Sequence, residues 1–499
     1  MKRNSVIIIG GGIGGLAAGS YLQMNGYDTH VLEMGRECGG VSVSWKRGEY
    51  VFDGATNWLP GSSDRSSVHK VLRELIDFSE MEIIDLDEFM QIDHDGETFH
   101  VYTDAHQLYR EMVRLAPEDQ ALAKQFTDAI AALSAMDIPF DTVPELLNPC
   151  TALKFVFQHS GVIRFYAKWR KMTIKQYALQ YKNKRLRTML QQIFPHHEFF
   201  SVLSVMMALA WMHARAAGYP RGGSAHFRDV IEKKYRDLGG TITLHKKVTK
   251  IAVKDNCATG VVCADGSSYD ADIVVSASDG TETIFRMLEG TYVNKRLKKQ
   301  YETFPVFPSL LQISLGVKKE YPDAPAKLVL PFSPPLPMGS ENAKTMLIRI
   351  CNFDDCFSPK GKTALIVHLR THDYKYWTTL RENDYEHYTR EKQRIADAVA
   401  EVLDRRFPGT RQNLETLDIA TPATYIRYTN NWKGSYQGWA PTPSNIGLNI
   451  PKTLPGLKNF YITGQWIATP GGLPRVIALG KHITKIICRD DHKKFRLHP

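Results

Sequence analysis

One glycine-rich turn, set between a predicted strand and a predicted helix, constrains the fold of this chain more than any other feature. Residues 6–9 read Val-Ile-Ile-Ile, which is typical of a buried strand, and a helical pattern follows the turn. Between them stand three glycines at the spacing G-x-G-x-x-G, namely Gly10, Gly12 and Gly15. The first permits a tight turn, the second lets a pyrophosphate approach the backbone, and the third allows close helix–strand packing. The spacing predicts a dinucleotide site, with the helix start at Ile13 and Gly14 facing the phosphates.

An acidic residue ends the next predicted strand. Residues 29–32 lead into Glu33 and Met34, at the offset where a carboxylate accepts hydrogen bonds from ribose hydroxyls. A 2′-phosphate at this place is disfavoured, because two negative charges would repel. A second turn of small residues then follows and is placed to lie against the pyrophosphate; it contains Arg36, Gly39 and Gly40. The site prefers a dinucleotide without a 2′-phosphate, such as FAD or NAD.

The far end of the chain favours FAD. A predicted strand at 460–463 ends in Gly464 and Gln465, and a turn rich in glycine and proline then opens the last helix through Gly472, Leu473 and Pro474. Proline suits a first helical turn, and glycines expose backbone N–H groups. The positive end of such a helix suits the electron-rich N1/O2 edge of a reduced flavin. We therefore expect a FAD site built by about the first 60 residues and completed by about the last 40.

The remaining pattern predicts an α/β fold with two interleaved domains. The helical pattern prevails over 63–135, with short strands near 81–84 and 99–102, and the clearest later helix covers 385–406. A Rossmann-type FAD-binding domain alternates with a substrate-binding domain of mixed sheet and helices. We expect the FAD-binding domain at 1–75, 218–300 and 446–499. A mostly helical, substrate- or membrane-facing segment covers 76–217, and the substrate-binding domain covers 301–445.

These motifs resemble the phytoene desaturase, carotenoid isomerase and retinol saturase group of FAD-dependent oxidoreductases, within the amine-oxidase-like flavoproteins. The glycine turn, Phe52-Asp53-Gly54, the helix entry at 219–223 and the run 258–277 all carry the likeness. The resemblance implies that Val248 touches the adenine, and that Arg475 stands where the family usually has a small residue. The predicted FAD-binding residues are Gly10, Gly12, Ile13, Gly14, Gly15, Glu33, Met34, Arg36, Gly39, Gly40, Ala55, Thr56, Val248, Ser276, Gly464, Gln465, Gly472, Leu473 and Pro474.

The resemblance implies desaturation, saturation or isomerisation of carbon–carbon bonds in an isoprenoid, carotenoid, retinoid or other lipid. Two alternatives stay open: an amine-oxidase-like enzyme for a polar amine, and a non-catalytic prenyl-binding module of the GDP-dissociation-inhibitor type. Because flavin carries the chemistry, no catalytic side chain is assigned, and His196-His197 is expected to be a hydrogen-bonded or surface pair. Aromatic residues are expected to line an apolar tunnel or to pack in the core; they are Trp58, Tyr425, Tyr428, Trp432, Tyr436, Trp439 and Trp466. Lys433, Arg475 and Lys481 either place a cation near the flavin or are solvated.

The net charge of +10 belongs to one segment. Residues 146–197 contain ten lysines and arginines and no aspartate or glutamate. Aromatic and basic residues alternate over 150–187, which predicts docking on an anionic membrane surface or, from Thr173 onward, a solvated helix face. No nucleic-acid-binding module accompanies the patch, so nucleic acid is not an expected partner. The seven cysteines lack metal-site spacing and the N-terminus lacks a secretory pattern, so we expect no metal and a cytoplasmic protein, peripherally associated with membranes through the patch.

Overall fold

The glycine turn lies in a five-stranded parallel sheet at one end of the molecule. The structure, a computed structural model, describes residues 4–448 and 450–497. The strand order is β19–β13–β1–β2–β9, and each pair for which a register is defined runs parallel. The bounds are β1 (Ser5–Ile9), β2 (Asp28–Leu32), β9 (Thr241–Thr243), β13 (Ile273–Ser276) and β19 (Phe460–Ile462). Strands β1 and β2, from the start of the chain, and β19, from its end, therefore belong to one sheet.

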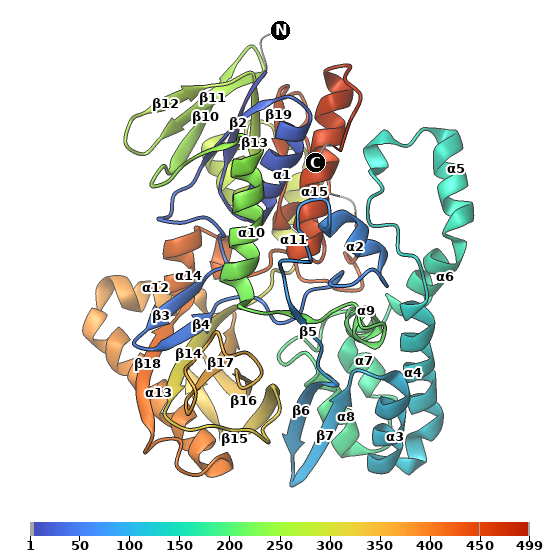
Figure 1. The fold of residues 1–499 in the computed structure, drawn as a ribbon, viewed down its shortest axis with the longest axis vertical. Coiled ribbons are helices and arrows are strands. Elements are labelled where there is room, and N and C mark those ends of the chain that lie inside the picture. The colour runs from blue at the N-terminus through green and yellow to red at the C-terminus, as the bar shows by residue number, and fades with distance from the viewer. Residues whose placement is uncertain (1–3, 449, 498–499) are drawn as a thin grey trace.

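Alternate residues of β1 bury the two faces of this sheet. Val6 and Ile8 pack with three helices, α1 (Ile13–Met24), α10 (Gly223–Asp237) and α15 (Leu473–Asp490). Ile7 and Ile9 face the opposite side, where the three-stranded sheet β10–β11–β12 contributes to the core. Its strands are β10 (Val248–Lys254), β11 (Cys257–Cys263) and β12 (Ser268–Asp270). This layered arrangement leaves the ends of β1 and β2, where the glycine turn begins, at the middle of the molecule (Figure 1).

A seven-stranded sheet forms the second domain, with the order β18–β14–β17–β16–β15–β6–β7. One face packs against α12 (Tyr374–Asn383) and α13 (Tyr385–Arg406) through residues such as Trp377 and Val399. The strands are β6 (Glu88–His94), β7 (Glu97–Tyr102), β14 (Ser309–Val317), β15 (Lys327–Met338), β16 (Glu341–Ile350), β17 (Thr363–Thr371) and β18 (Leu414–Ala420). Residues from the predicted segments 76–217 and 301–445 thus share one sheet.

Helices cover the β6–β7 edge and form a separate core. They are α3 (Ala105–Leu115), α4 (Gln120–Ser134), α7 (Ile174–Ala178), α8 (Lys184–Gln191) and α9 (Val202–His213). Helices α5 (Pro149–Gln158) and α6 (Ser160–Trp169) stand at the outer edge of this group, and α5 projects from it (Figure 1). Apolar as it is, α9 is too short to span a bilayer, and among the described residues no helix is long and apolar enough to do so.

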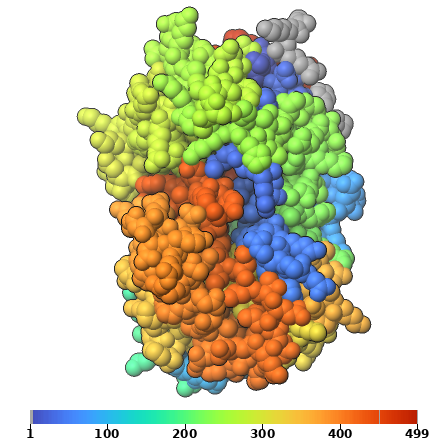
Figure 2. All heavy atoms as spheres, turned by 90° about the vertical axis from the view of Figure 1, so that its left-hand side faces the viewer, coloured from blue at the N-terminus to red at the C-terminus, as the bar shows by residue number. Residues whose placement is uncertain are grey.

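Smaller elements connect the two domains. The hairpin of β3 (Ser44–Arg47) and β4 (Tyr50–Asp53) hydrogen-bonds to the seven-stranded sheet, where Trp45 and Arg47 donate to Asp418. Figure 2 shows N-terminal residues, in blue, between the green residues of the first domain and the orange residues of the second. The other elements are α2 (Ser67–Leu72), β5 (Ile83–Ile84), β8 (Tyr219–Pro220), α11 (Lys295–Thr303) and α14 (Pro422–Thr429).

Strands β6 and β15 were not among the predicted elements. Helix α13 has the predicted bounds, and the expected strands near 81–84 and 99–102 appear as β5 and β7. Strand β15 was not predicted because it carries four prolines, which remove backbone donors. The register of β15 with β16 shifts between Pro331 and Leu336, so the strand bypasses the missing donors at a bulge. Residues 1–3, part of the N-terminal segment judged not to be secretory, lie outside the described residues.

Candidate functional site

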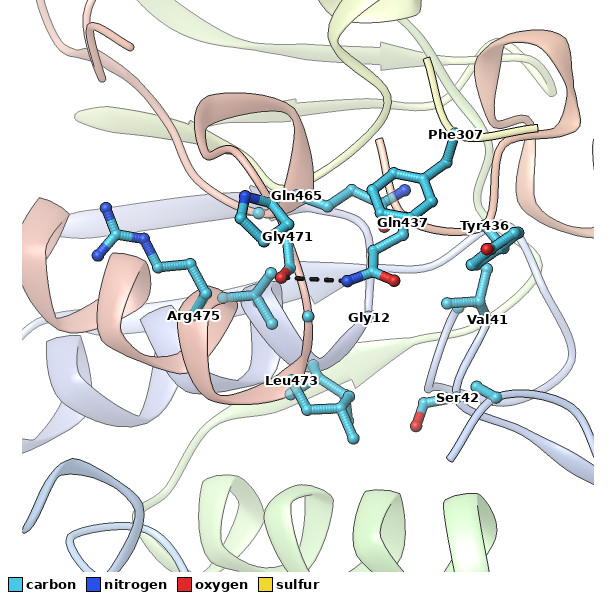
Figure 3. A pocket seen from close by; sticks show the side chains of 18 of the residues that line it. Gly12, Val41, Ser42, Phe307, Tyr436, Gln437, Gln465, Gly471, Leu473 and Arg475 are labelled. Atoms are coloured by element: carbon cyan, nitrogen blue, oxygen red, sulfur yellow. Dashed lines mark hydrogen bonds between the residues drawn. The ribbon is translucent and has the colours of Figure 1, made fainter. Parts of the chain in front are cut away.

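A cavity of about 590 Å³ lies between the two domains. One part of its wall comes from the glycine turn, the end of β2 and the start of α15. The other part comes from β6, α9, the segment around Tyr436 and the face of the seven-stranded sheet that lies opposite α12 and α13. Figure 3 shows Gly12 and Leu473 facing this space together with Val41, Phe307 and Tyr436. The cavity thus joins the predicted dinucleotide site to a second compartment, which we call the substrate half.

The glycines of the turn have different physical tasks. A Cβ atom on Gly15 would overlap the carbonyl oxygen of Gly10, so this position must be glycine for α1 to follow β1. Gly10 itself has a φ of +98°, which a side chain rarely allows. A Cβ on Gly12, by contrast, meets no protein atom within 4 Å, and Gly12 lines the cavity. Gly12 is therefore not required by protein packing, which fits a position kept bare for a bound phosphate.

Glu33 is buried at the end of β2, where its carboxylate orders the turn. The backbone N–H of Gly11 donates to Oε2 at 2.6 Å, and that of Gly35 donates to Oε1 at 2.7 Å. Burial raises the pKa of Glu33, and these backbone donors oppose that shift. Each carboxylate oxygen still has a free lone pair for a ribose hydroxyl. Met34 and Val248 line the same part of the cavity, where the adenine was expected.

The start of α15 closes the site from the other end of the chain. Gly472, at φ +115°, precedes the first helical residue, and Pro474 stands in the first turn. Gly464 approaches the first helix so closely that a Cβ on Gly14 would lie 3.2 Å from its Cα. The Nε2 of Gln437 donates to the carbonyl oxygen of Gly471 at 3.3 Å and fixes the loop (Figure 3). These contacts hold a helix N-terminus, with its positive dipole, at the junction of the two halves.

Most of the predicted FAD-binding residues line the cavity, and three do not. Ala55, Thr56, Gly39, Gly40 and Gln465 join those already named. Gly15 acts by packing, as predicted, and the side chain of Arg36 is exposed beside Glu37, 3.7 Å away. Ser276 is buried, and its hydroxyl hydrogen-bonds to that of Thr283 at 2.7 Å. The assignment of Arg36 and Ser276 to direct cofactor contact therefore has no support from the geometry.

The structure adds a residue whose role the sequence pattern alone did not reveal. Asp53 is fully buried; its carboxylate accepts from the hydroxyl of Tyr219 at 2.9 Å and lies 3.6 Å from the guanidinium of Arg349. Arg349 also donates to the carbonyl oxygens of Asp53 and Thr56. This pair fixes the segment 54–57, which lines the cavity. The motif Phe52-Asp53-Gly54 was the available signal, but its partner on β16 has no sequence signature.

The substrate half has mainly aromatic and aliphatic walls. Of the aromatic residues singled out from sequence, Trp58, Tyr428, Tyr436 and Trp466 line the cavity. The side chains of Trp432 and Trp439 instead pack with Trp466 in a core cluster, and the hydroxyl of Tyr425 donates to Gln312. Other walls come from Phe89, Phe194, Phe200, Phe307, Met207, Leu310 and Leu347. This half is suited to an apolar molecule.

His197 and Lys481 are both buried, but only His197 lines the cavity. His197 is buried, its Nδ1 lies 2.8 Å from the carbonyl oxygen of Pro195, and its Nε2 lies 3.0 Å from the hydroxyl of Tyr436. Burial, aided by the charge of Arg370, holds the pKa of His197 well below its usual range. It is the hydrogen-bonded histidine that was expected. Lys481, by contrast, is buried and does not line the cavity, and Glu74 and Asp141 pair with it at 2.7 and 2.8 Å.

The donor set of the cavity fits a flavin dinucleotide. The buried hydroxyls of Ser42 and Thr469 belong to residues that line it and have no hydrogen-bond partner among the described residues. Bound flavin supplies hydride and electron transfer, so the residues of the chain need only hold it, orient the substrate and exclude water.

In the acidic loop outside the cavity, Asp354, Asp355 and Cys356 place ligand atoms within 4.8 Å of one another. Both aspartates face Arg221, which accounts for that cluster without a metal.

Comparisons with known proteins agree with this geometry. The chain is 24% identical to the phytoene desaturase (lycopene-forming) of a Paracoccus strain, over 97% of each chain. It is also 24% identical to the chloroplastic prolycopene isomerase of Daucus carota, over 93% of this chain and 76% of that protein. The cyclohexylamine oxidase of Brevibacterium oxydans shares the fold, with a TM-score of 0.59 and 15% identity over 99% of this chain and 100% of that one.

A family model described as flavin containing amine oxidoreductase matches residues 13–484, which is nearly the whole chain. The match begins at Ile13, the first residue of α1, and ends within α15. FAD as the cofactor and an oxidoreductase activity are therefore confirmed. The chain belongs to the flavin containing amine oxidoreductase family.

Proposed function

We propose that this FAD-dependent oxidoreductase acts on carbon–carbon bonds of an isoprenoid lipid, such as a carotenoid- or retinoid-like chain. The observation that carries the proposal is the apolar, aromatic substrate half, which opens directly onto the start of α15 where flavin is expected. An extended hydrocarbon buried there would lose its contact with water, which is the main driving force for binding such a molecule. The likeness to a phytoene desaturase and a prolycopene isomerase supports the same substrate class.

The charge of the cavity disfavours the alternative of a polar amine. Among the described residues, Glu33 and Asp279 are the carboxylates that line it. Glu33 lies at the adenine end, and Asp279 already accepts from the backbone N–H groups of Thr281, Glu282 and Trp432 at 2.8 to 3.0 Å. An ammonium group in the substrate half would therefore meet cations without a free carboxylate.

The test is anaerobic reduction of the purified, FAD-loaded protein by a panel of substrates. Phytoene, prolycopene and retinol in anionic liposomes are compared with putrescine and cyclohexylamine added to the same liposomes, and both the flavin spectrum and the extracted lipids are measured. We expect a lipid to be desaturated, saturated or isomerised, and the amines to leave the flavin oxidised. Reduction by an amine with unchanged lipids would contradict the proposal. Tight binding of a prenyl lipid without any redox or isomer change would instead support the non-catalytic alternative.

We also propose that α5 and α6 dock on an anionic membrane surface. Leu153, Val156 and Phe157 of α5 are 73%, 51% and 84% exposed, and Lys154 and Arg164 are exposed beside them. Exposed apolar and basic residues on one short helical unit are typical of an element that lies among lipid headgroups. Tyr166, on α6, lines the cavity. A lipid leaving the bilayer near α6 would thus reach the substrate half without crossing water.

The segment after Thr173 packs in the helical core instead of projecting from it. Thr173 caps α7, and α7 and α8 bury Ile174, Tyr177 and Leu186 in the helical core. The proposed docking surface is therefore residues 149–169 rather than the whole of 150–187. Liposome flotation tests it: binding should need anionic lipid, fall with salt, and be lost in Leu153→Ser/Phe157→Ser. Lys184→Glu/Arg185→Glu, on α8, is the matched control and should bind normally. Equal flotation with neutral lipid, or none, contradicts the proposal.

A further inference from the structure

A buried lysine stands in the wall of the substrate half. Lys327, the first residue of β15, is 4% exposed and lines the cavity. Its Nζ donates to the carbonyl oxygen of Asn57 at 3.0 Å and lies 4.7 Å from the ring centre of Phe89 and 5.2 Å from that of Trp58. Over residues 4–448 and 450–497, no carboxylate forms an ion pair with it. One carbonyl and two ring faces leave two of its three donor positions without an oxygen acceptor.

The surroundings of Lys327 make its charge costly. Its neighbour across the strand pair is Arg349, which uses its own carboxylate partner, Asp53. Burial, together with the charge of Arg349, lowers the pKa of Lys327 to about 7. Arg370, a second cation of the cavity wall, also has no carboxylate partner among the described residues and donates to the carbonyl oxygen of Pro195. A cavity for a pure hydrocarbon gains nothing from such groups, because a buried charge without a counterion is destabilising.

We propose that the substrate of this enzyme carries a carboxylate end group, which Lys327 holds beneath Trp58 and Phe89. This inference rests on the proposed isoprenoid substrate and narrows it to an acidic, monoanionic chain. A single ammonium with aromatic neighbours suits one carboxylate, whereas a diphosphate would need several cations or a metal. The aromatic rings would then pack on the first carbons of the chain, and the apolar walls would take the rest.

Lys327 also supports the segment 54–57 through Asn57, so the test must separate support from recognition. Lys327→Gln keeps a donor for the carbonyl oxygen of Asn57 and removes the charge. Lys327→Arg keeps the charge. Lys344→Gln, an exposed residue of the neighbouring strand β16, is the matched control. FAD content and thermal midpoint are measured for each variant.

The probes are all-trans-retinoic acid and its methyl ester, which share a chain and differ in charge. Binding is followed at pH 6.5 by quenching of tryptophan fluorescence. We expect the wild type, Lys327→Arg and Lys344→Gln to bind the acid at least about tenfold more tightly than the ester. In Lys327→Gln the acid should bind no better than the ester, and the affinity for the ester should be unchanged.

Two results would overturn the inference. The wild type could bind acid and ester equally, or Lys327→Gln could weaken both ligands to the same extent, in which case the lysine only supports the segment 54–57. If neutral lipids are converted while the acid is ignored, the proposed function stands and the carboxylate inference fails. If neither ligand binds and an amine reduces the flavin, the proposed function itself fails.

Discussion

The two halves of the cavity are built in different ways. The dinucleotide half is formed mainly by backbone: glycines at three turns, a helix start, and N–H groups ordered by Glu33. The substrate half is formed by side chains from β6, α9, β14 to β17 and the segment near Tyr436. Backbone chemistry recurs wherever the same ligand is bound, whereas side-chain walls can change with each substrate. The first half therefore identifies the cofactor, and the second must identify the substrate.

Asp53 tests how far the two halves depend on one another, and its loss should have the largest effect. Asp53→Ala leaves the charge of Arg349 buried without its partner and releases the hydroxyl of Tyr219. We expect a loss of about 3–5 kcal/mol in the free energy of unfolding, since breaking a buried ion pair leaves a charge uncompensated. Urea denaturation of the FAD-loaded protein measures it. A loss below about 1 kcal/mol would show that the domain junction does not depend on this pair.

Two glycine substitutions separate packing from cofactor binding within the dinucleotide half. Gly15→Ala places a methyl group against the carbonyl oxygen of Gly10, and we expect it to cost about 1–3 kcal/mol of stability and to lose FAD. Gly12→Ala meets no protein atom within 4 Å, so the apoprotein should keep its thermal midpoint and lose only FAD affinity. Calorimetry and released flavin are the two measurements. If Gly12→Ala retains full FAD affinity, the phosphates do not lie over this residue.

The substrate half should respond to pH through Lys327. Asp279, whose pKa burial raises to about 7, lines the same cavity, so the pH response of Lys327→Gln is the baseline against which that of the wild type is compared. Lys327 has a pKa of about 7, lowered by burial and by Arg349, whose own charge is paired with Asp53. The lysine is charged below this pH and neutral above it, so the preference for retinoic acid over its ester should fall as pH rises through 7. We expect a decrease of about tenfold between pH 6 and 8. His368, which also lines the cavity, has a pKa lowered to about 3 by burial and by the charges of Arg349 and Arg370, so it stays neutral throughout. A pH-independent preference would remove Lys327 from recognition.

His197 should have the smallest effect. The pKa of this histidine lies well below its usual range, so at neutral pH it is not a general acid, and its partners are the carbonyl oxygen of Pro195 and the hydroxyl of Tyr436. We expect His197→Gln to lower kcat by less than about tenfold, compared with the 10²–10⁴-fold that loss of a general acid or base costs. Steady-state turnover with FAD content held equal decides between these outcomes, and a 10⁴-fold loss would assign the histidine to catalysis.

The sequence predicted the backbone-built parts of the molecule and missed most of the side-chain-built ones. The glycine spacing, Glu33 and helix α13 were identified because local pattern determines them. Strand β15 was missed because its prolines oppose strand structure locally, and the sheet overrides them. Lys327 was missed with it, since its distinction is burial rather than any motif. Arg36 and Ser276 do not line the cavity, and a turn and a strand end give no indication of which way a side chain points.

The most direct test of the account is whether a lipid in one half reports on flavin in the other. The wild type and Leu347→Trp, which fills the substrate half from β16, are titrated anaerobically with the isoprenoid that the substrate panel identifies, while the visible flavin spectrum is recorded. We predict that both proteins hold equal amounts of FAD, that the lipid shifts or bleaches the flavin bands of the wild type, and that Leu347→Trp does not respond. Equal responses from the two proteins, or lipid binding to the wild type without a spectral change, would contradict the single-cavity account.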